Sequence, residues 1–174
     1  MPGAAFLHGE RVTLHTVERE DLAFLQRHWN HPDVRRRTAR VHPENGQQVT
    51  DAFEESDADG VRLLACADGD RIGVVSLFDV DEAAGRAELV AWLTPERRGN
   101  GYATEAAGLL VDYAFDERRL HRLEARALAT DDEARAVVET LGFEQEGRLR
   151  DEQYVDGEYV DRVVYGLLEA EWRA

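Results

Sequence analysis

The stretch of sequence that decides the fold reads Leu93-Thr94-Pro95-Glu96-Arg97-Arg98-Gly99-Asn100-Gly101-Tyr102-Ala103-Thr104-Glu105-Ala106. It leads from an apolar strand pattern into a helix pattern that runs from Gly101 to Asp116. The first amides of a helix have no partner within the helix, and the helix dipole gives them partial positive charge. Glycine lets the backbone approach an anion, and Arg97 and Arg98 add formal charge beside it. The stretch therefore predicts an anion-binding loop between a strand and a helix.

By itself the loop indicates phosphate without saying which phosphate, and a structural turn with solvated arginines also fits it. A lysine-containing nucleotide loop is excluded, because the sequence contains no lysine. A dinucleotide-binding loop would need a third glycine where Thr104 stands, together with an early parallel strand pair. The segments before Leu93 predict hairpins instead.

On either side of the loop, periodicity and turn signals predict alternating strands and helices. The predicted strands span residues 11–15, 61–67, 71–80, 87–93, 121–128, 145–154 and 159–168. The predicted helices span residues 18–29, 32–37, 43–56, 101–116 and 131–141. Asp68-Gly69 and Asp156-Gly157 predict the turns of two hairpins. This order predicts one α/β domain over residues 1–174, with a mixed, mostly antiparallel sheet of six to seven strands and helices on both faces.

The composition narrows the class of protein. A chain of 174 residues suits one domain with a substantial core. No apolar run approaches the roughly 20 residues that span a membrane, and the first residues lack the features of a secretion signal. The single cysteine, Cys66, excludes an internal disulfide, and its apolar neighbours favour a buried core position over a nucleophile. We expect a cytoplasmic protein that is not bound to a membrane.

The charge is strongly acidic. The sequence has 36 acidic residues against 21 basic ones, all arginine, for a net charge of -15. An acidic surface attracts cationic acceptors, but acids scattered over every segment favour adaptation to a salt-rich cytoplasm. Nucleic acid is an unsuitable partner for such a surface. No set of residues has metal-ligand spacing, since His28 and His31 lack a third ligand, and we expect no metal.

Several further motifs occur in a fixed order along the chain. They are Trp29-Asn30-His31-Pro32-Asp33-Val34, Ala87-Glu88-Leu89-Val90-Ala91-Trp92-Leu93, Asp112-Tyr113-Ala114-Phe115, Leu141-Gly142-Phe143-Glu144, Gly147-Arg148-Leu149-Arg150 and Asp156-Gly157-Glu158-Tyr159-Val160-Asp161. With the pyrophosphate-type motif Arg98-Gly99-Asn100-Gly101-Tyr102-Ala103, they cover nearly the whole chain. The sequence resembles the GNAT N-acetyltransferase superfamily, and within it the branch that acetylates the N-termini of ribosomal proteins.

The resemblance implies a binding site for acetyl-CoA. The pantetheine arm would lie between the strands at 88–93 and 121–128, and the loop amides would hold the pyrophosphate. The cofactor-binding residues that the resemblance implies are Val90, Trp92, Leu93, Arg97, Arg98, Gly99, Asn100, Gly101, Tyr102, Ala103, Thr104, Asp131 and Arg135.

The chain departs from the family on one helix. Asp131 and Ala134 stand where the family commonly has asparagine and serine, and Val138 stands where other members have tyrosine. Ionised aspartate only accepts hydrogen bonds, and neither hydroxyl is present to protonate the departing thiolate. These departures favour a second hypothesis, in which the protein binds acyl-CoA without catalysing transfer.

Direct transfer needs a neutral amine, a polarised carbonyl and a proton for the thiolate. Strand alternation places Glu88 on the same face as Val90 and Trp92, so Glu88 is the candidate base, although a structural ion pair fits it too. Tyr154 is the candidate acid, with a packed tyrosine at the rim as its alternative. Trp29 and His31 are candidates for the acceptor cleft, or else a core tryptophan and a helix-capping histidine.

The predicted activity is therefore transfer of an acetyl group from acetyl-CoA to a primary amine. The resemblance favours the α-amine of a protein N-terminus, such as that of a ribosomal protein. A small amine, such as a polyamine, an amino acid or an aminoglycoside, remains the alternative acceptor. Family analogy also makes a homodimer plausible.

Overall fold

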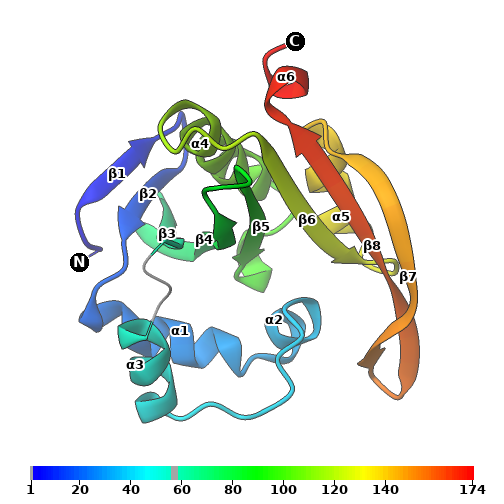
Figure 1. The fold of residues 1–174 in the computed structure, drawn as a ribbon. Helices are drawn as coiled ribbons and strands as arrows, with labels where there is room; N and C mark the ends of the chain where they lie inside the picture. Colours follow the sequence, from blue (N-terminus) through cyan, green and yellow to red (C-terminus); the bar gives the residue numbers. More distant parts are fainter. Residues whose placement is uncertain (1, 56–58) are drawn as a thin grey trace.

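An eight-stranded sheet runs through the centre of the molecule (Figure 1). This computed structural model describes residues 2–55 and 59–174 of the chain. The strand order is β1-β2-β3-β4-β5-β6-β8-β7, and every neighbouring pair is antiparallel except β5 and β6. The strands are β1 (Ala5–His8), β2 (Thr13–Thr16), β3 (Val61–Ala67), β4 (Asp70–Asp81), β5 (Arg86–Leu93), β6 (Arg122–Leu128), β7 (Glu144–Val155) and β8 (Glu158–Leu168).

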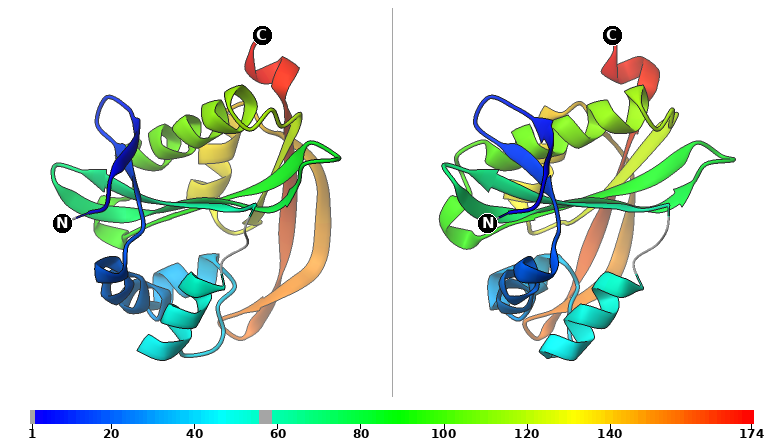
Figure 2. Two further views of the ribbon diagram at one scale, coloured as in Figure 1. Left: turned by 60° about the vertical axis from the view of Figure 1, so that its left-hand side comes forward. Right: turned by 90° about the vertical axis from the view of Figure 1, so that its left-hand side faces the viewer.

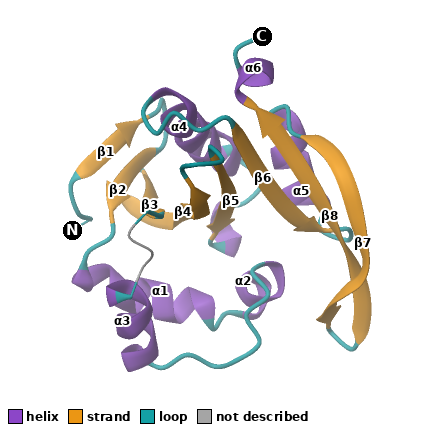
Figure 3. Ribbon diagram, in the orientation of Figure 1, coloured by secondary structure: helices purple, strands orange, loops and turns teal. Residues whose placement is uncertain are grey.

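Helices cover both faces of this sheet (Figures 2 and 3). The α-helices are α1 (Leu22–Trp29), α2 (Pro32–Arg37), α3 (Gly46–Glu54), α4 (Tyr102–Asp116), α5 (Asp132–Thr140) and α6 (Glu169–Trp172). Two 3-10 turns, η1 (Arg19–Asp21) and η2 (Pro95–Arg97), lead into α1 and toward α4. Helices α1 to α3 pack on one face and α4 and α5 on the other, which confirms the predicted α/β arrangement.

Strand alternation assigns the core residues to the two faces. Leu63 and Val75 belong to the cluster under α4, whereas Leu64, Val74 and Trp92 belong to the cluster under α1. Both faces of β3 and β4 are therefore buried, which explains their nearly continuous apolar runs. Cys66 lies in the second cluster, and burial raises the pKa of its thiol to about 11, as expected of a core cysteine.

The predicted hairpin turns are present. Asp68 and Gly69 have φ angles of 54° and 83°, and Asp156 and Gly157 have φ angles of 52° and 91°. Two successive residues of positive φ form the turn whose twist matches that of the flanking strands. The Asp-Gly pairs therefore identified β3–β4 and β7–β8 correctly.

The sheet has more strands than predicted. β1 is an additional edge strand, and β2 begins at Thr13 rather than at residue 11. β1 has only four residues, and it is held by pairing with β2, so the local sequence gives little indication of it. Likewise α6 follows β8 without a strong helical pattern. The predicted helix 43–56 forms α3 from Gly46 to Glu54, and Ser56 lies outside the described residues.

The parallel pair of β5 and β6 is short. Only Arg86, Ala87 and Glu88 pair with β6, opposite Arg122, Leu123 and Glu124. Beyond that point β5 continues along β4 to Leu93, while β6 continues along β8 to Leu128. The two strands therefore separate beyond this point (Figure 1). Among the described residues, no helix is long and apolar enough to cross a membrane.

A buried carboxylate anchors α1 to the sheet. Asp21 is fully buried, accepts a hydrogen bond from the Glu18 amide at 2.8 Å and pairs with Arg71 Nε of β4 at 2.7 Å. Removing one partner of a buried pair leaves the other charge uncompensated in a medium of low dielectric constant. This pair therefore holds the start of α1 against the sheet.

We expect Asp21→Ala to lower the free energy of unfolding by about 3 kcal/mol, measured by urea denaturation. Glu169→Ala, which breaks the exposed pair of Glu169 with Arg173, serves as the control and should change stability little. Equal effects of the two substitutions would contradict the structural role of Asp21.

Candidate active site

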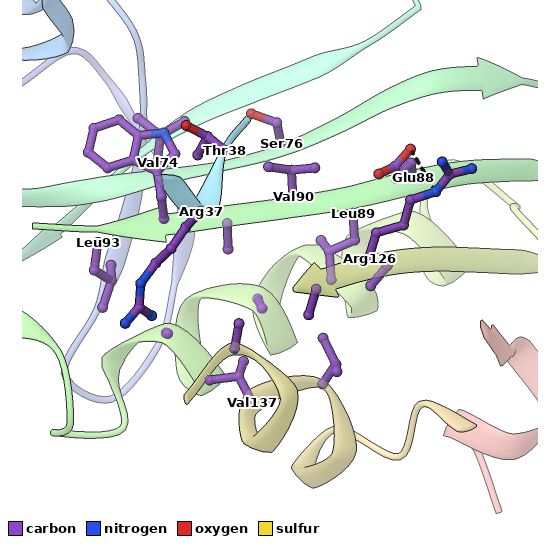
Figure 4. Close-up of a pocket in the computed structure, with 18 of the residues that line it drawn as sticks. Arg37, Thr38, Val74, Ser76, Glu88, Leu89, Val90, Leu93, Arg126 and Val137 are labelled. Atoms are coloured by element: carbon purple, nitrogen blue, oxygen red, sulfur yellow. Dashed lines mark ion pairs between the residues drawn. The ribbon is translucent and has the colours of Figure 1, made fainter. Parts of the chain in front are cut away.

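A cavity of about 970 Å³ lies where β5 and β6 separate (Figure 4). Ala103, Ala107, Ala134 and Val137 line it from α4 and α5. From the other face of the sheet it is lined by side chains of α1, β3 and β4 and of the segment after α2, namely Trp29, Arg40, Arg62, Val74 and Ser76. Residues from elements on both sides of the sheet therefore line the cavity. Its volume suits a ligand of cofactor size.

The loop between β5 and α4 forms one end of this cavity. Gly99 and Gly101 have φ angles of 75° and 79°, a conformation that L side chains rarely adopt. The first hydrogen bond into α4 runs from the Glu105 amide to the Gly101 carbonyl at 3.1 Å, so the amides of residues 102–104 are those that a helix leaves unpaired. Gly99, Gly101, Ala103 and Thr104 all line the cavity. The loop thus presents amides and the positive end of α4 to a ligand.

The β1–β2 connection fixes this loop from outside. The Glu105 carboxylate accepts hydrogen bonds from the amides of Arg11 and Val12 at 2.7 and 3.0 Å. Burial opposes ionisation, but these hydrogen bonds lower the pKa of Glu105 below its ordinary value. The Arg11 guanidinium donates to the Asn100 carbonyl at 2.9 Å and lies 4.9 Å from the centre of the Tyr102 ring. The acidic side chain in the first turn of α4 is therefore bound by the β1–β2 connection.

Arg98 brings a formal charge to the cavity. Its Nε donates to the Leu93 carbonyl at 3.3 Å, and its Nη2 is buried with no hydrogen-bond partner among the described residues. Burial, and then the charge of Arg37, lower the pKa of the Arg98 guanidinium. A buried donor without a partner is costly unless a ligand supplies an acceptor.

Glu88 lies at the point where β5 and β6 part. Its side chain is 16% exposed, lines the cavity and lies 4.0 Å from Arg126 of β6 (Figure 4). Burial raises the pKa of Glu88 above its ordinary value, Arg126 opposes part of that rise, and Glu124 adds to it. Val90 and Trp92, two and four residues further along the same face, also line the cavity. A half-buried carboxylate of raised pKa beside a cavity is suited to accept a proton.

Comparison with known proteins decides the family. A model of the acetyltransferase (GNAT) domain matches residues 11–144, which is most of the chain. The chain belongs to the GNAT acetyltransferase family. It is therefore an N-acetyltransferase, and members of this family use acetyl-CoA to acetylate an amine.

Individual relatives agree with this assignment. The putative ribosomal N-acetyltransferase YdaF of Bacillus subtilis is 38% identical over 117 residues, which span 67% of this chain and 64% of that protein. The spermidine N(1)-acetyltransferase of Escherichia coli strain K12 is 28% identical over 94% of this chain and 89% of its own length. A crystal structure of a probable acetyltransferase superposes with a TM-score of 0.82 and 30% identity, covering 94% of this chain and 96% of that one.

The GNAT cavity fits a molecule of acetyl-CoA. The glycine loop, the N-terminus of α4 and the unpaired Nη2 of Arg98 form an anion site of the kind that a pyrophosphate needs. Gly99 has open space where a Cβ would stand, so a ligand can approach its backbone. Small residues of α4 and α5 leave room beside the strands.

The departures from the family on α5 have a structural explanation. The Asp131 carboxylate caps α5 by accepting from the Ala134 amide at 3.1 Å, and it pairs with Arg37 of α2 at 3.0 Å. Both interactions use its capacity to accept, which asparagine would only partly replace. Ala134 and Val138 line the cavity and offer no hydroxyl there. Of the predicted cofactor-binding residues, Val90, Trp92, Leu93 and Asp131 all line the cavity together with the loop.

Other predicted site residues lie outside the lining. Tyr154 is 57% exposed in the β7–β8 hairpin and packs edge-on against Tyr159, so the geometry gives no support to its prediction as the acid. Arg97 pairs with Asp68 and Asp70, while Asn100 and Tyr102 contact Arg11. Arg135 donates to the Tyr165 hydroxyl at 3.1 Å. None of these side chains is among the residues that line the cavity.

Of the two residues predicted to line the acceptor cleft, Trp29 lines the cavity and His31 does not. His31 caps α2 by accepting from the Asp33 amide at 3.3 Å and is not a lining residue, whereas Trp29 lines the cavity. The sequence interpretation overlooked Arg62 and Ser76, which lie opposite one another on β3 and β4 and both line the cavity. A single arginine inside the apolar strand 61–67 is a signal that could have identified Arg62.

The raised pKa of Glu88 has a consequence for stability. Because the folded state disfavours its charged form, the folded protein holds this proton more tightly than the unfolded chain does. The proton on Glu88 therefore adds to the free energy of unfolding at pH values below the unfolded pKa. This contribution is lost as pH rises through the folded pKa.

We expect Glu88→Gln to gain stability relative to the wild type as pH is raised from 4 toward 8, measured as the difference in urea unfolding at each pH. Glu124→Gln is the matched control on β6. It removes pairs with Arg122 and Arg126 at 3.6 and 2.9 Å and should show no such gain. A pH-independent difference for Glu88→Gln would contradict the raised pKa.

Proposed function

We propose that this GNAT enzyme transfers the acetyl group of acetyl-CoA directly to the α-amine of a protein N-terminus. The observation that carries the proposal is that one continuous cavity joins the anion-binding loop at Gly99 to the half-buried carboxylate of Glu88. The likeness to the putative ribosomal N-acetyltransferase of B. subtilis supports this acceptor.

Backbone groups would make most of the contacts with the donor, acetyl-CoA. The amides of the loop and the Arg98 guanidinium would hold the pyrophosphate. Beyond Glu88, the described residues of β5 have no partner on β6, so the free edge near Val90 to Leu93 would bond the pantetheine amides. Acetyl-CoA supplies the activated acyl group when it is bound.

Glu88 would accept the proton of the attacking amine, directly or through one water. An α-amine has a reference pKa of about 7.7–8.0 against about 10.4 for lysine, so its deprotonation is easier by roughly 3 kcal/mol. A carboxylate whose pKa burial has raised is a better match to such an amine than an ordinary glutamate. This is the reason for preferring an α-amine to a lysine side chain.

A small amine is the second candidate acceptor, with a polyamine as the best-supported case. The likeness to the spermidine acetyltransferase of E. coli extends over 94% of this chain, more than for the ribosomal relative. The net charge of -15 would also attract a polycation. Direct comparison of N-terminal peptides with spermidine as acceptors, measured by thiol release from acetyl-CoA, separates the two.

The donor site is tested by Gly99→Ala. The new Cβ meets no protein atom, so the substitution acts through the strained φ and through the space that the ligand needs. We expect the dissociation constant for acetyl-CoA to rise at least about tenfold in titration calorimetry at high salt.

Gly157→Ala is the matched control for this experiment. Gly157 has a φ of 91°, also has open space at Cβ, and lies in the β7–β8 turn. Both variants should lose about 1–2 kcal/mol of stability, but only Gly99→Ala should weaken binding. Unchanged binding by Gly99→Ala, or no binding by the folded wild type, would contradict the donor site.

The base is tested by Glu88→Gln with an N-terminal peptide as acceptor. We expect kcat/KM to fall by about 10²-fold near pH 7, and we expect the loss to shrink above pH 9, where the acceptor is already neutral. Glu124→Gln, opposite Glu88 but outside the cavity lining, should retain activity. A loss that is constant across pH would show that Glu88 does not act as the base.

A further inference from the structure

On the side of α1 to α3, the cavity is lined by an arginine that has no carboxylate partner among the described residues. Arg62 of β3 is half-buried and lines the cavity, and its Nη1 is buried with no hydrogen-bond partner. No ion pair to it occurs among the described residues. In a chain with 36 acidic residues, an unpaired guanidinium inside a cavity calls for an explanation.

The other arginines that line the cavity provide a comparison. Arg37, Arg126 and Arg162 each form ion pairs with neighbouring carboxylates. Arg98 forms none with the residues that the structure describes, and it lies at the loop where an anionic ligand is expected. Arg62 shares with Arg98 a buried, unpaired nitrogen, but it lies on strand β3 and not in the glycine loop.

Sheet register places Arg62 relative to the reacting centre. Arg62 lies opposite Ser76 on β4, and Ser76 lies opposite Val90 on β5, so the three side chains share one face. Two strand spacings separate Arg62 from Val90, which is roughly 10 Å between backbones. Glu88 is the next residue of β5 on that face. The cleft therefore has a carboxylate at β5 and an unpaired guanidinium at β3.

Arg40 adds a second positive charge to the cavity near Arg62. Its guanidinium lies 3.8 Å from the centre of the Trp29 ring, and that of Arg62 lies 5.7 Å from the same ring. Arg40 pairs with Glu44, whereas Arg62 has no carboxylate partner among the described residues. Burial, and then the charge of Arg40, lower the pKa of Arg62. Ala39 adopts a φ of 56°, and the Arg40 amide bonds the Arg35 carbonyl at 3.0 Å, which turns the chain after α2.

We propose that Arg62, assisted by Arg40, binds a carboxylate of the acceptor, so that this enzyme prefers amines that carry a carboxylate close by. The inference rests on the proposed function and narrows its substrate class. A span of roughly 10 Å equals about three extended residues. Because the arginine side chain reaches across part of this span, the acceptor has to bridge a shorter distance. The acceptor is then a peptide with aspartate or glutamate at its first or second position. A polyamine would place a second cation beside two arginines.

The test compares two peptides that begin Ala-Asp and Ala-Asn and are otherwise identical. We expect the wild type to show a kcat/KM at least tenfold higher for the acidic peptide, mainly through a lower KM. Arg62→Gln should reduce this ratio to about one, and Arg40→Gln should reduce it in part. Arg35→Gln, at an exposed position of α2 outside the cavity lining, should keep the wild-type ratio.

Thermal unfolding separates this role from a structural one. Arg62→Gln removes a half-buried charge that has no carboxylate partner among the described residues, so its Tm should equal or exceed that of the wild type. A clear fall in Tm, with the ratio changed only in step with it, would assign Arg62 to the fold and overturn the proposal.

A binding measurement keeps the two proposals distinguishable. CoA-loaded wild type is titrated calorimetrically with the N-acetylated forms of both peptides. Tighter binding of the acidic form that is lost in Arg62→Gln supports the carboxylate site, even if the enzyme does not acetylate either peptide. Absence of acetylation would then count against the proposed function alone. Equal binding of both forms, or equal turnover of both peptides, overturns the carboxylate site and leaves the proposed function standing.

Discussion

The hydrogen bonds between β5 and β6 end at Glu88 and Glu124, and the site depends on that break. Each strand keeps its outer partner, β5 with β4 and β6 with β8, so the sheet remains one body while its centre opens. Free strand edges normally invite pairing with another chain. Here they face a cavity inside the molecule, where α4 and α5 cover one side and α1 to α3 lie on the other. Backbone donors and acceptors that would be a liability at the surface become available to a ligand.

The side chains around the break differ between the two faces. Toward α4 and α5 the lining is small and apolar, with Ala103, Ala107 and Ala134 leaving space beside the strands. Toward α1 and α2 it is charged, where Arg40 pairs with Glu44 and Arg62 has no carboxylate partner among the described residues. The exterior is acidic and the cavity is rich in guanidinium groups. This contrast is why net charge alone is a poor guide to the acceptor.

Connections between distant segments hold the two sides of the cavity in place. Arg37 reaches from α2 to Asp131 and Glu133 at the start of α5, at 3.0 and 2.8 Å. On the far side, Glu105 binds the backbone of Arg11 and Val12 and so joins α4 to the β1–β2 connection. Asp21 and Arg71 join α1 to β4. Each link begins near a helix terminus, and each includes a carboxylate that is buried or accepts hydrogen bonds from backbone amides.

Local pattern was enough to determine the hairpins, the glycine loop and the buried position of Cys66. Asp68-Gly69 and Asp156-Gly157 require only positive φ angles, and Gly99 and Gly101 require the same freedom before a helix. The helix pattern predicted from Gly101 to Asp116 forms α4, which spans Tyr102–Asp116. These features depend on residues close together in the chain, so the sequence by itself predicted them.

Tertiary structure alone decided which side chains meet in the cavity. Arg62 reaches it because β3 pairs with β4 in one register, and a shift of one residue would turn it to the other face. Tyr154, Arg97 and Arg135 have suitable chemistry but are directed to Tyr159, to Asp68 and Asp70, and to Tyr165. β1 is held by its pairing with β2 and by the contact of Phe6 with Tyr113 of α4. Strand register and side-chain direction arise from contacts between residues far apart in the chain, which no local pattern contains.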